Sequence, residues 1–71
     1  MDERQIVPIS GITFYVSLTA NRKGYCHYLV GTYGSPESPV SVSLTGTDSF
    51  PLRVQAAQKG LALILEGQTY N

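Results

Sequence analysis

The chain has 71 residues and a mass of 7.7 kDa, enough for one small domain but not for two independent hydrophobic cores. Hydrophobic residues make up 42% of the sequence and charged residues 14%, a composition that excludes an intrinsically disordered chain. Five basic and five acidic side chains cancel, so the strongest electrostatic argument for a dedicated nucleic-acid-binding protein is missing.

We therefore expect residues 1–71 to form a single domain, with residues 1–5 as a flexible N-terminus. Cys26 is the only cysteine, so no internal disulfide can form, and an intracellular, cytoplasmic protein is expected. The longest apolar run, 61–65, is far shorter than the roughly 18 residues that a membrane helix requires. No association with a membrane is expected.

Residues 12–20 alternate between apolar and polar side chains, which predicts a half-buried β-strand. The segment from Gln5 to Ile9 is a candidate further strand, restricted to a sheet edge because Pro8 has no N–H group to donate. Within 12–20, the inward side chains would be Ile12, Phe14, Val16 and Leu18, and the outward ones Thr13, Tyr15, Ser17 and Thr19.

The segment 21–24 (NRKG) is typical of a tight turn, and residues 25–33 form the returning strand of a hairpin. The register of this hairpin decides which face of the returning strand is buried. We favour a three-residue loop with a bulge at Gly24, which turns Cys26, Tyr28 and Val30 inward. A two-residue Arg22-Lys23 loop would shift the pairing by one and bury the other set instead, namely Tyr25, His27, Leu29 and Tyr33.

Residues 34–39 contain prolines and no apolar side chain, which predicts a surface connection. Residues 40–45 then alternate again, with valine and leucine on one face and serine and threonine on the other. They form the third strand of the expected meander.

The hydrophobic period changes after this strand. Asp48 or Ser49 can cap a helix that has Pro51 in its first turn and Gly67 as its C-terminal stop, which gives a length of about 16 residues. Gly60 leaves two alternatives: the helix continues and the glycine permits a close contact, which we favour, or the helix ends and 61–65 forms a last strand. The apolar stripe at helical spacing consists of Phe50, Val54, Ala57, Leu61, Ile64 and Leu65.

Together these elements predict an α+β fold: a three- or four-stranded antiparallel β-meander with one C-terminal helix packed on one face (β-β-β-α). The side chains expected in its core are Ile12, Phe14, Val16, Leu18, Tyr28, Val30, Val40, Val42, Leu44, Val54, Ala57, Leu61 and Ile64.

We expect no catalytic, metal-binding or cofactor-binding site. Cys26 and His27 are neighbours on a strand and project to opposite faces, so they cannot act as a nucleophile and its base. One cysteine and one histidine are too few for a metal site. No two carboxylates are spaced to share a strand face.

Two surfaces remain as candidate sites. The first is the open face of the sheet, which would carry Tyr15, Tyr25, His27 and Tyr33 and could contact a protein or stack nucleic-acid bases. These tyrosines could equally be cross-strand pairs that only stabilise the sheet.

The hairpin tip adds Arg22 and Lys23 to this face, either as phosphate contacts or as a solvated turn. The second candidate surface is the side of the helix away from the apolar stripe. It would carry Leu52, Ala56 and Leu63 as a dimer seam or docking groove, unless a break at Gly60 turns Leu63 inward.

The order of strands followed by a helix is similar to the double-stranded-RNA-binding type of core, to plant-type three-stranded DNA-binding domains and to antitoxins of the HicB family. The segment 46–52 (GTDSFPL), which runs into Ala56-Ala57, resembles the strand-to-helix junction of HicB-like chains. The Gly-Cys element usual before that junction is missing, so the resemblance implies a shared architecture and not membership of the family.

We expect a small non-enzymatic intracellular protein that binds another protein and works by occluding its surface, of the antitoxin or phage-encoded host-defence-inhibitor (anti-CRISPR-like) type. The alternative is a nucleic-acid-binding module that uses the tyrosine-bearing sheet face. A core of this size supplies only about 3–5 kcal/mol, so a partner or a second copy in a homodimer is a natural source of further stability.

Overall fold

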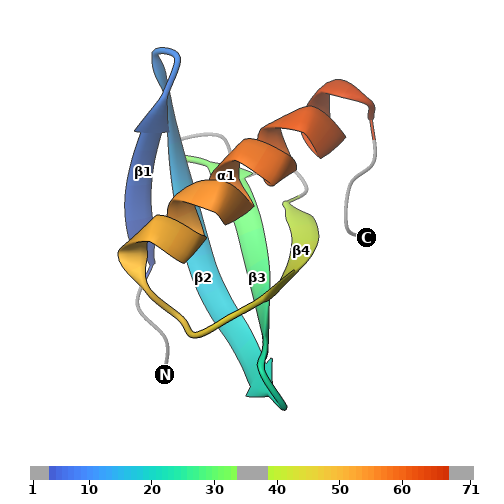
Figure 1. Ribbon diagram of the computed structural model, residues 1–71. Helices are drawn as coiled ribbons and strands as arrows, with labels where there is room; N and C mark the ends of the chain where they lie inside the picture. Colours follow the sequence, from blue (N-terminus) through green and yellow to red (C-terminus); the bar gives the residue numbers. More distant parts are fainter. Residues whose placement is uncertain (1–3, 34–38, 68–71) are drawn as a thin grey trace.

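The computed structural model describes residues 4–33 and 39–67 and shows one antiparallel sheet with one helix across it (Figure 1). The sheet order is that of the chain, so each strand pairs with the next in a simple meander. The predicted α+β fold with a C-terminal helix is confirmed. Its elements are β1 (Gln5–Ile9), β2 (Ile12–Arg22), β3 (Tyr25–Thr32), β4 (Val40–Thr45) and α1 (Phe50–Leu65).

The core lies between the sheet and α1 and is built from the alternate side chains that each strand turns toward the helix. Most of the expected core is confirmed; Leu18, Leu44, Val54, Leu61 and Ile64 are only partly buried and pack against it. Val7, Leu52 and Ala56 belong to the core although the sequence pattern did not place them there. The buried set is Val7, Phe14, Val16, Cys26, Tyr28, Val30, Val40, Val42, Leu52, Ala56 and Ala57.

Strand β1 occupies an edge of the sheet, as its proline requires. It is joined to β2 by the two-residue turn Ser10-Gly11, in which both residues have positive φ (51° and 79°). Such turns match the right-handed twist of the strands that they connect. The turn pairs Ile9 with Ile12 and places Val7 opposite Phe14 on the buried face.

The β2–β3 hairpin buries the face of β3 that we favoured, but its turn and its bulge lie at other positions than we expected. Lys23 and Gly24 form a two-residue turn with φ of 50° and 84°, which pairs Arg22 with Tyr25. Continued without interruption, that register would bury the wrong face of β3. The irregularity lies between Leu18 and Ala20, where Leu18 pairs with Tyr28 and Ala20 with His27. A bulge at this point, and not at Gly24, therefore restores the burial pattern.

Helix α1 begins and ends where the capping residues indicate. Ser49 is the N-cap, and its hydroxyl accepts a hydrogen bond from the Leu52 N–H at 3.2 Å. At the other end Gly67 has a φ of 79°, and its N–H donates to the Ile64 carbonyl at 3.0 Å. The helix is continuous over 16 residues, which confirms the favoured alternative at Gly60.

Gly60 sets how α1 lies on the sheet. A β-carbon added there would come within 2.6 Å of Val30 Cγ1 and 3.2 Å of Val40 Cγ2, so the helix backbone touches the sheet at this point. The most deeply buried helix positions are Ala56, Ala57 and Gly60, all small. Close approach of the backbone, and not the bulk of the apolar side chains, selects this face.

Two expectations about burial are wrong, the first because of this close approach and the second because of where the residue lies in the sheet. The contact stripe of α1 is turned by about a quarter of a turn from the predicted one, so Leu52 and Ala56 lie in the core and offer no separate surface. Leu63 is partly buried against the same core. Ile12, expected inside, is 39% exposed because it lies at the tip of the β1–β2 hairpin, beyond the reach of α1 (Figure 1).

The surface connection expected over 34–39 lies outside the described residues except for Pro39, as do residues 1–3 of the expected flexible N-terminus and residues 68–71. Gln5, the last residue of that N-terminus, begins β1.

Gly60→Ala should lower the free energy of unfolding. The alanine gains about 1 kcal/mol in helix propensity, but its methyl group must displace Val30 or lift α1, and we expect a net loss of about 1–2 kcal/mol in urea denaturation. In a Val30→Ala background the same substitution should cost less, because the nearest atom, Val30 Cγ1, is removed and the closest remaining contact is Cβ at 2.9 Å. A stabilising Gly60→Ala would contradict the close approach.

Candidate functional site: the outer face of the sheet

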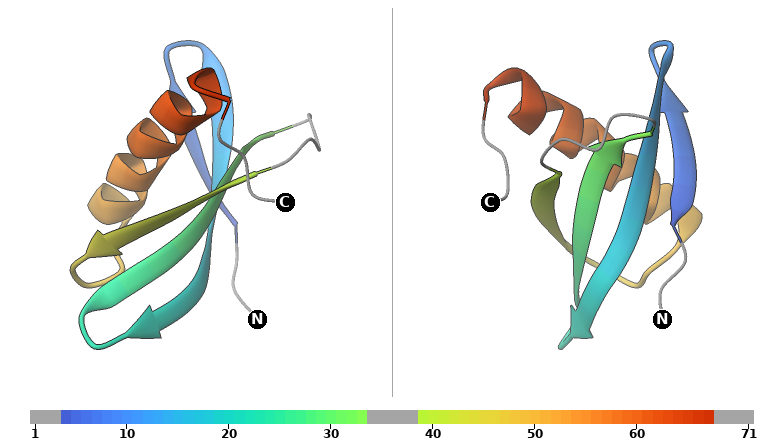
Figure 2. Two further views of the ribbon diagram at one scale, coloured as in Figure 1. Left: turned by 90° about the vertical axis from the view of Figure 1, so that its right-hand side faces the viewer. Right: turned by 180° about the vertical axis from the view of Figure 1, so that it is seen from behind.

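The face of the sheet opposite α1 is not covered by any of the described elements. Figure 2, right, views the sheet from this side, with α1 behind it. Strand pairing fixes which side chains stand on it, because directly paired residues share a face. We refer to it as the outer face. Its side chains are Ile6, Pro8, Thr13, Tyr15, Ser17, Ala20, Arg22, Tyr25, His27, Leu29, Tyr33, Ser41, Ser43 and Thr45.

Four large apolar and aromatic side chains of the outer face lie toward one end of it. Ile6 on β1 pairs with Tyr15 on β2, and the Tyr33 N–H donates to the Thr13 carbonyl at 2.7 Å, which continues the ladder past β3. Leu29 stands two residues along β3 from Gly31, the partner of Tyr15. Ile6 is 41% exposed and Tyr33 63%. We call Ile6, Tyr15, Leu29 and Tyr33 the apolar cluster.

Tyr15 lies flat within this cluster. A β-carbon added at Gly31 would come within 2.5 Å of the Tyr15 hydroxyl oxygen and 2.6 Å of Cε2 and Cζ, so the ring covers this glycine. The guanidinium of Arg4 lies over the same ring, 4.6 Å from its centroid. Tyr15 therefore fills the gap that Gly31 leaves in the sheet surface, and Arg4 is placed at the border of the apolar cluster.

His27 stands in the middle of the outer face and is bonded to its neighbours. Its Nδ1 lies 2.7 Å from the Ser43 hydroxyl oxygen, and its backbone carbonyl accepts a hydrogen bond from the Thr19 hydroxyl at 2.8 Å. The Thr19 bond ties the bulged segment of β2 to β3. These contacts give His27 a role in fixing the sheet.

Tyr25 lies at the other end, beside the hairpin turn. It pairs with Arg22 on β2 and with Thr45 on β4, and it is 51% exposed. Eight residues of extended strand separate it from Tyr33, a distance of about 26 Å. The residues predicted for this face are thus spread along it: Tyr15 lies near Tyr33 at one end, Tyr25 lies with Arg22 and Lys23 at the other, and His27 lies between them.

The outer face carries positive charge at its margins. Arg4 lies at one border and Arg22 at the hairpin end. Among the described residues the carboxylates are Asp48 and Glu66, which lie in the β4–α1 connection and at the end of α1. The described part of the outer face therefore has no acidic side chain.

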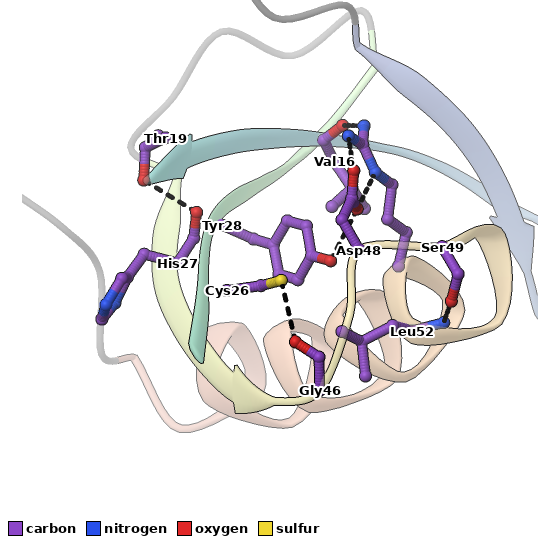
Figure 3. Close-up of polar contacts among 10 residues, drawn as sticks. Val16, Thr19, Cys26, His27, Tyr28, Gly46, Asp48, Ser49 and Leu52 are labelled. Carbon is purple, nitrogen blue, oxygen red and sulfur yellow. Dashed lines mark hydrogen bonds and ion pairs between the residues drawn. The ribbon is translucent and has the colours of Figure 1, made fainter. Parts of the chain in front are cut away.

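Cys26 and His27 lie on opposite faces, as predicted. Cys26 is buried under α1, with its Sγ 3.4 Å from the Gly46 carbonyl oxygen, whereas His27 is on the outer face (Figure 3). Within residues 4–33 and 39–67, no group of three or more histidine, cysteine or carboxylate side chains is arranged to hold a metal ion. No helix in the described part of the chain is long and apolar enough to cross a membrane.

A polar cluster on the inner side fastens the sheet to α1 (Figure 3). The Tyr28 hydroxyl donates to Asp48 Oδ1 at 2.8 Å. Arg53 donates to the same carboxylate through two nitrogens, Nε to Oδ1 at 2.8 Å and Nη2 to Oδ2 at 2.9 Å. Arg53 Nη1 also donates to the Val16 carbonyl at 3.3 Å. Asp48 was one of two predicted N-caps, but the cap is Ser49. Asp48 instead joins β3 to α1, and Arg53 extends the cluster to β2.

This cluster shifts the pKa values of Asp48 and Tyr28. The guanidinium of Arg53 lowers the pKa of Asp48, and the hydrogen bond from Tyr28 lowers it further, against the opposing effect of burial. Burial raises the pKa of Tyr28, and its bond to the Asp48 carboxylate raises it further. Asp48 is thus held as the carboxylate, which accepts from Arg53 and Tyr28, and Tyr28 is held as the phenol, which donates to Asp48. This is the arrangement of a structural ion pair.

Comparison with protein-family models, with curated proteins and with solved structures returns no match, so function must be argued from these surfaces alone. The sequence pattern placed Tyr15, Tyr25 and Tyr33 on the outer face, and the strand register puts them there. It did not place Arg4 or Ile6 beside them. Residues 5–9 (QIVPI) show no alternation of polar and apolar side chains, so the sequence carries no signal for the face on which Ile6 lies.

Asp48→Asn should lower the free energy of unfolding by about 2 kcal/mol at pH 7, because Arg53 keeps its burial and loses its charged partner. The pKa of Asp48 is lowered on folding from its ordinary value of 3.8, so its contribution is present above that pH and is lost as the pH falls through the folded value. Denaturation of the unmodified protein and of Asp48→Asn should therefore show that the difference between their free energies of unfolding becomes smaller as the pH is lowered through the acidic range. If the two free energies of unfolding differed by the same amount down to low pH, the stabilising role of the charged Asp48 would be contradicted.

Proposed function

We propose that this chain is a small non-enzymatic intracellular module that binds another protein through the outer face of its sheet and acts by occluding the partner's surface. The observation that carries the proposal is the apolar cluster, which leaves Ile6 and Tyr33 open to solvent on a face that no described element covers. Antitoxins and phage-encoded inhibitors of host defence complexes are the types of protein that work in this way.

The composition of the apolar cluster is that of a protein-binding site. Tyrosine and large aliphatic side chains form the energetic centre of protein interfaces, and a polar rim keeps water from it. Here the centre is bordered by hydroxyl side chains, among them Thr13, Ser17 and Ser41. Because Tyr15 is held between Gly31 and Arg4, its ring is already ordered and loses little entropy on binding.

The charges indicate the chemistry of the partner. With Arg4 and Arg22 at its margins and no carboxylate among its described residues, the outer face is complementary to an apolar patch flanked by aspartate or glutamate. The partner surface that it fits is therefore acidic at its edge and apolar at its centre.

Nucleic acid is the alternative partner, and the geometry favours it less. A run of stacked bases needs several aromatic rings at close spacing, whereas Tyr15 and Tyr33 lie near each other and Tyr25 is about 26 Å from Tyr33 along β3. Of the two neighbouring rings, that of Tyr15 already has the Arg4 guanidinium over it.

Photo-crosslinking in cells that naturally contain the protein tests this proposal. A benzophenone amino acid at position 33, on the exposed end of the apolar cluster, should crosslink a defined protein. The same group at Gln58, on the exposed side of α1, should not. Crosslinking to nucleic acid at position 33, or retention of a mixed oligonucleotide pool that weakens steeply with salt, would contradict protein binding and support the alternative.

Two isoleucines provide a matched pair of variants. Ile6 and Ile12 are 41% and 39% exposed, but Ile6 is on the outer face and Ile12 faces the helix side. Ile6→Glu should reduce affinity for the crosslinked partner at least about tenfold, as expected for a central interface residue, and Ile12→Glu should not. Equal loss of affinity in both variants, with similar thermal stability, would contradict the proposed face.

A further inference from the structure

The two edges of the sheet differ in how they are protected. Edge strands expose unpaired N–H and C=O groups, and proteins commonly blunt them with proline or charge. Strand β1 has both devices, since Pro8 lies within it and Arg4 directly precedes it. Strand β4 has neither: its sequence is VSVSLT, and no described strand pairs with its outer side.

The sequence of β4 is compatible with pairing to itself. Valine and leucine face α1, serine and threonine lie on the outer face, and no side chain is charged, so two antiparallel copies meet without repulsion. Paired residues must share a face, and the two registers that pair most of β4 on this condition have the two-fold axis at Val42 or at Ser43. With the axis at Val42, Val40 of one copy lies opposite Leu44 of the other.

Helix α1 extends over the position that a second strand would take. It crosses β4 at the Val40 end, where Gly60 lies against Val30 and Val40. Both Figure 1 and Figure 2, right, show the last turns of α1 passing beyond β4, away from β3. These turns carry the partly buried Leu61 and Leu65, which is 78% exposed. An apolar overhang thus stands beside an open strand edge.

We propose that two copies of this chain pair through their β4 strands and form a continuous eight-stranded antiparallel sheet. In this dimer the overhanging end of each helix covers the neighbouring copy's β4 near Leu44, which its own chain leaves partly exposed. The two-fold axis puts the two overhangs at opposite ends of the joint. Both outer faces remain free on the same side, so the dimer is independent of the function proposed for them.

Sedimentation equilibrium of the full chain tests the dimer. The mass should rise with concentration from 7.7 kDa to twice that value. The double variant Ser41→Lys/Ser43→Lys places like charges across the joint in either register and should raise the dissociation constant at least about tenfold. The matched variant Thr13→Lys/Ser17→Lys adds the same charge to the outer face of β2 and should dimerise normally. A monomer at all concentrations, or equal weakening in both variants, would overturn the proposal.

A second measurement avoids substitution, because Ser43→Lys also removes the contact with His27. Amide hydrogen exchange in the unmodified chain should slow in β4 as the concentration rises, whereas exchange in β1 should not change. Concentration-dependent protection of β1, or of neither edge, would overturn pairing through β4.

Discussion

A single helix can cover only one face of a four-stranded sheet, and the exposed features of this protein follow from that constraint. Helix α1 has 16 residues, a length of about 24 Å, and crosses the sheet diagonally (Figure 1). Among the residues that the structure describes, nothing therefore covers the outer face, the β1–β2 hairpin tip extends beyond the helix, and the helix end extends beyond β4. A larger domain would cover these regions with further elements, whereas here no described element covers them.

Two contacts decide how the helix is placed. Gly60 allows the backbone of α1 to reach the sheet over Val30 and Val40, and Arg53 reaches from the first turn of α1 to the Asp48 carboxylate and to the Val16 carbonyl. One contact fixes the distance at the C-terminal half of the helix, and the other fixes the N-terminal half. This explains why the buried stripe follows small residues and not the largest apolar ones.

Much of the fold was predictable because it depends on local chemistry. Alternation gave the strands, and Ser49 and Gly67 bounded the helix. The device that sets the β2–β3 register was not predictable, since a turn at Lys23-Gly24 and a bulge near Thr19 compensate each other. The rotation of α1 and the ion pair of Asp48 with Arg53 depend on tertiary contacts that no spacing reveals. For the candidate site, alternation placed the tyrosines on one face, but only the strand register separates Tyr25 from Tyr33 and brings Ile6 beside Tyr15.

The central claim is that one face of the sheet is open in solution. Paramagnetic relaxation of the tyrosine ring protons by a soluble, uncharged gadolinium chelate measures this directly. We expect strong broadening for Tyr25 and Tyr33, which are 51% and 63% exposed, and none for the buried Tyr28. A Tyr33 ring as well protected as that of Tyr28 would show that the outer face is covered and would contradict the account.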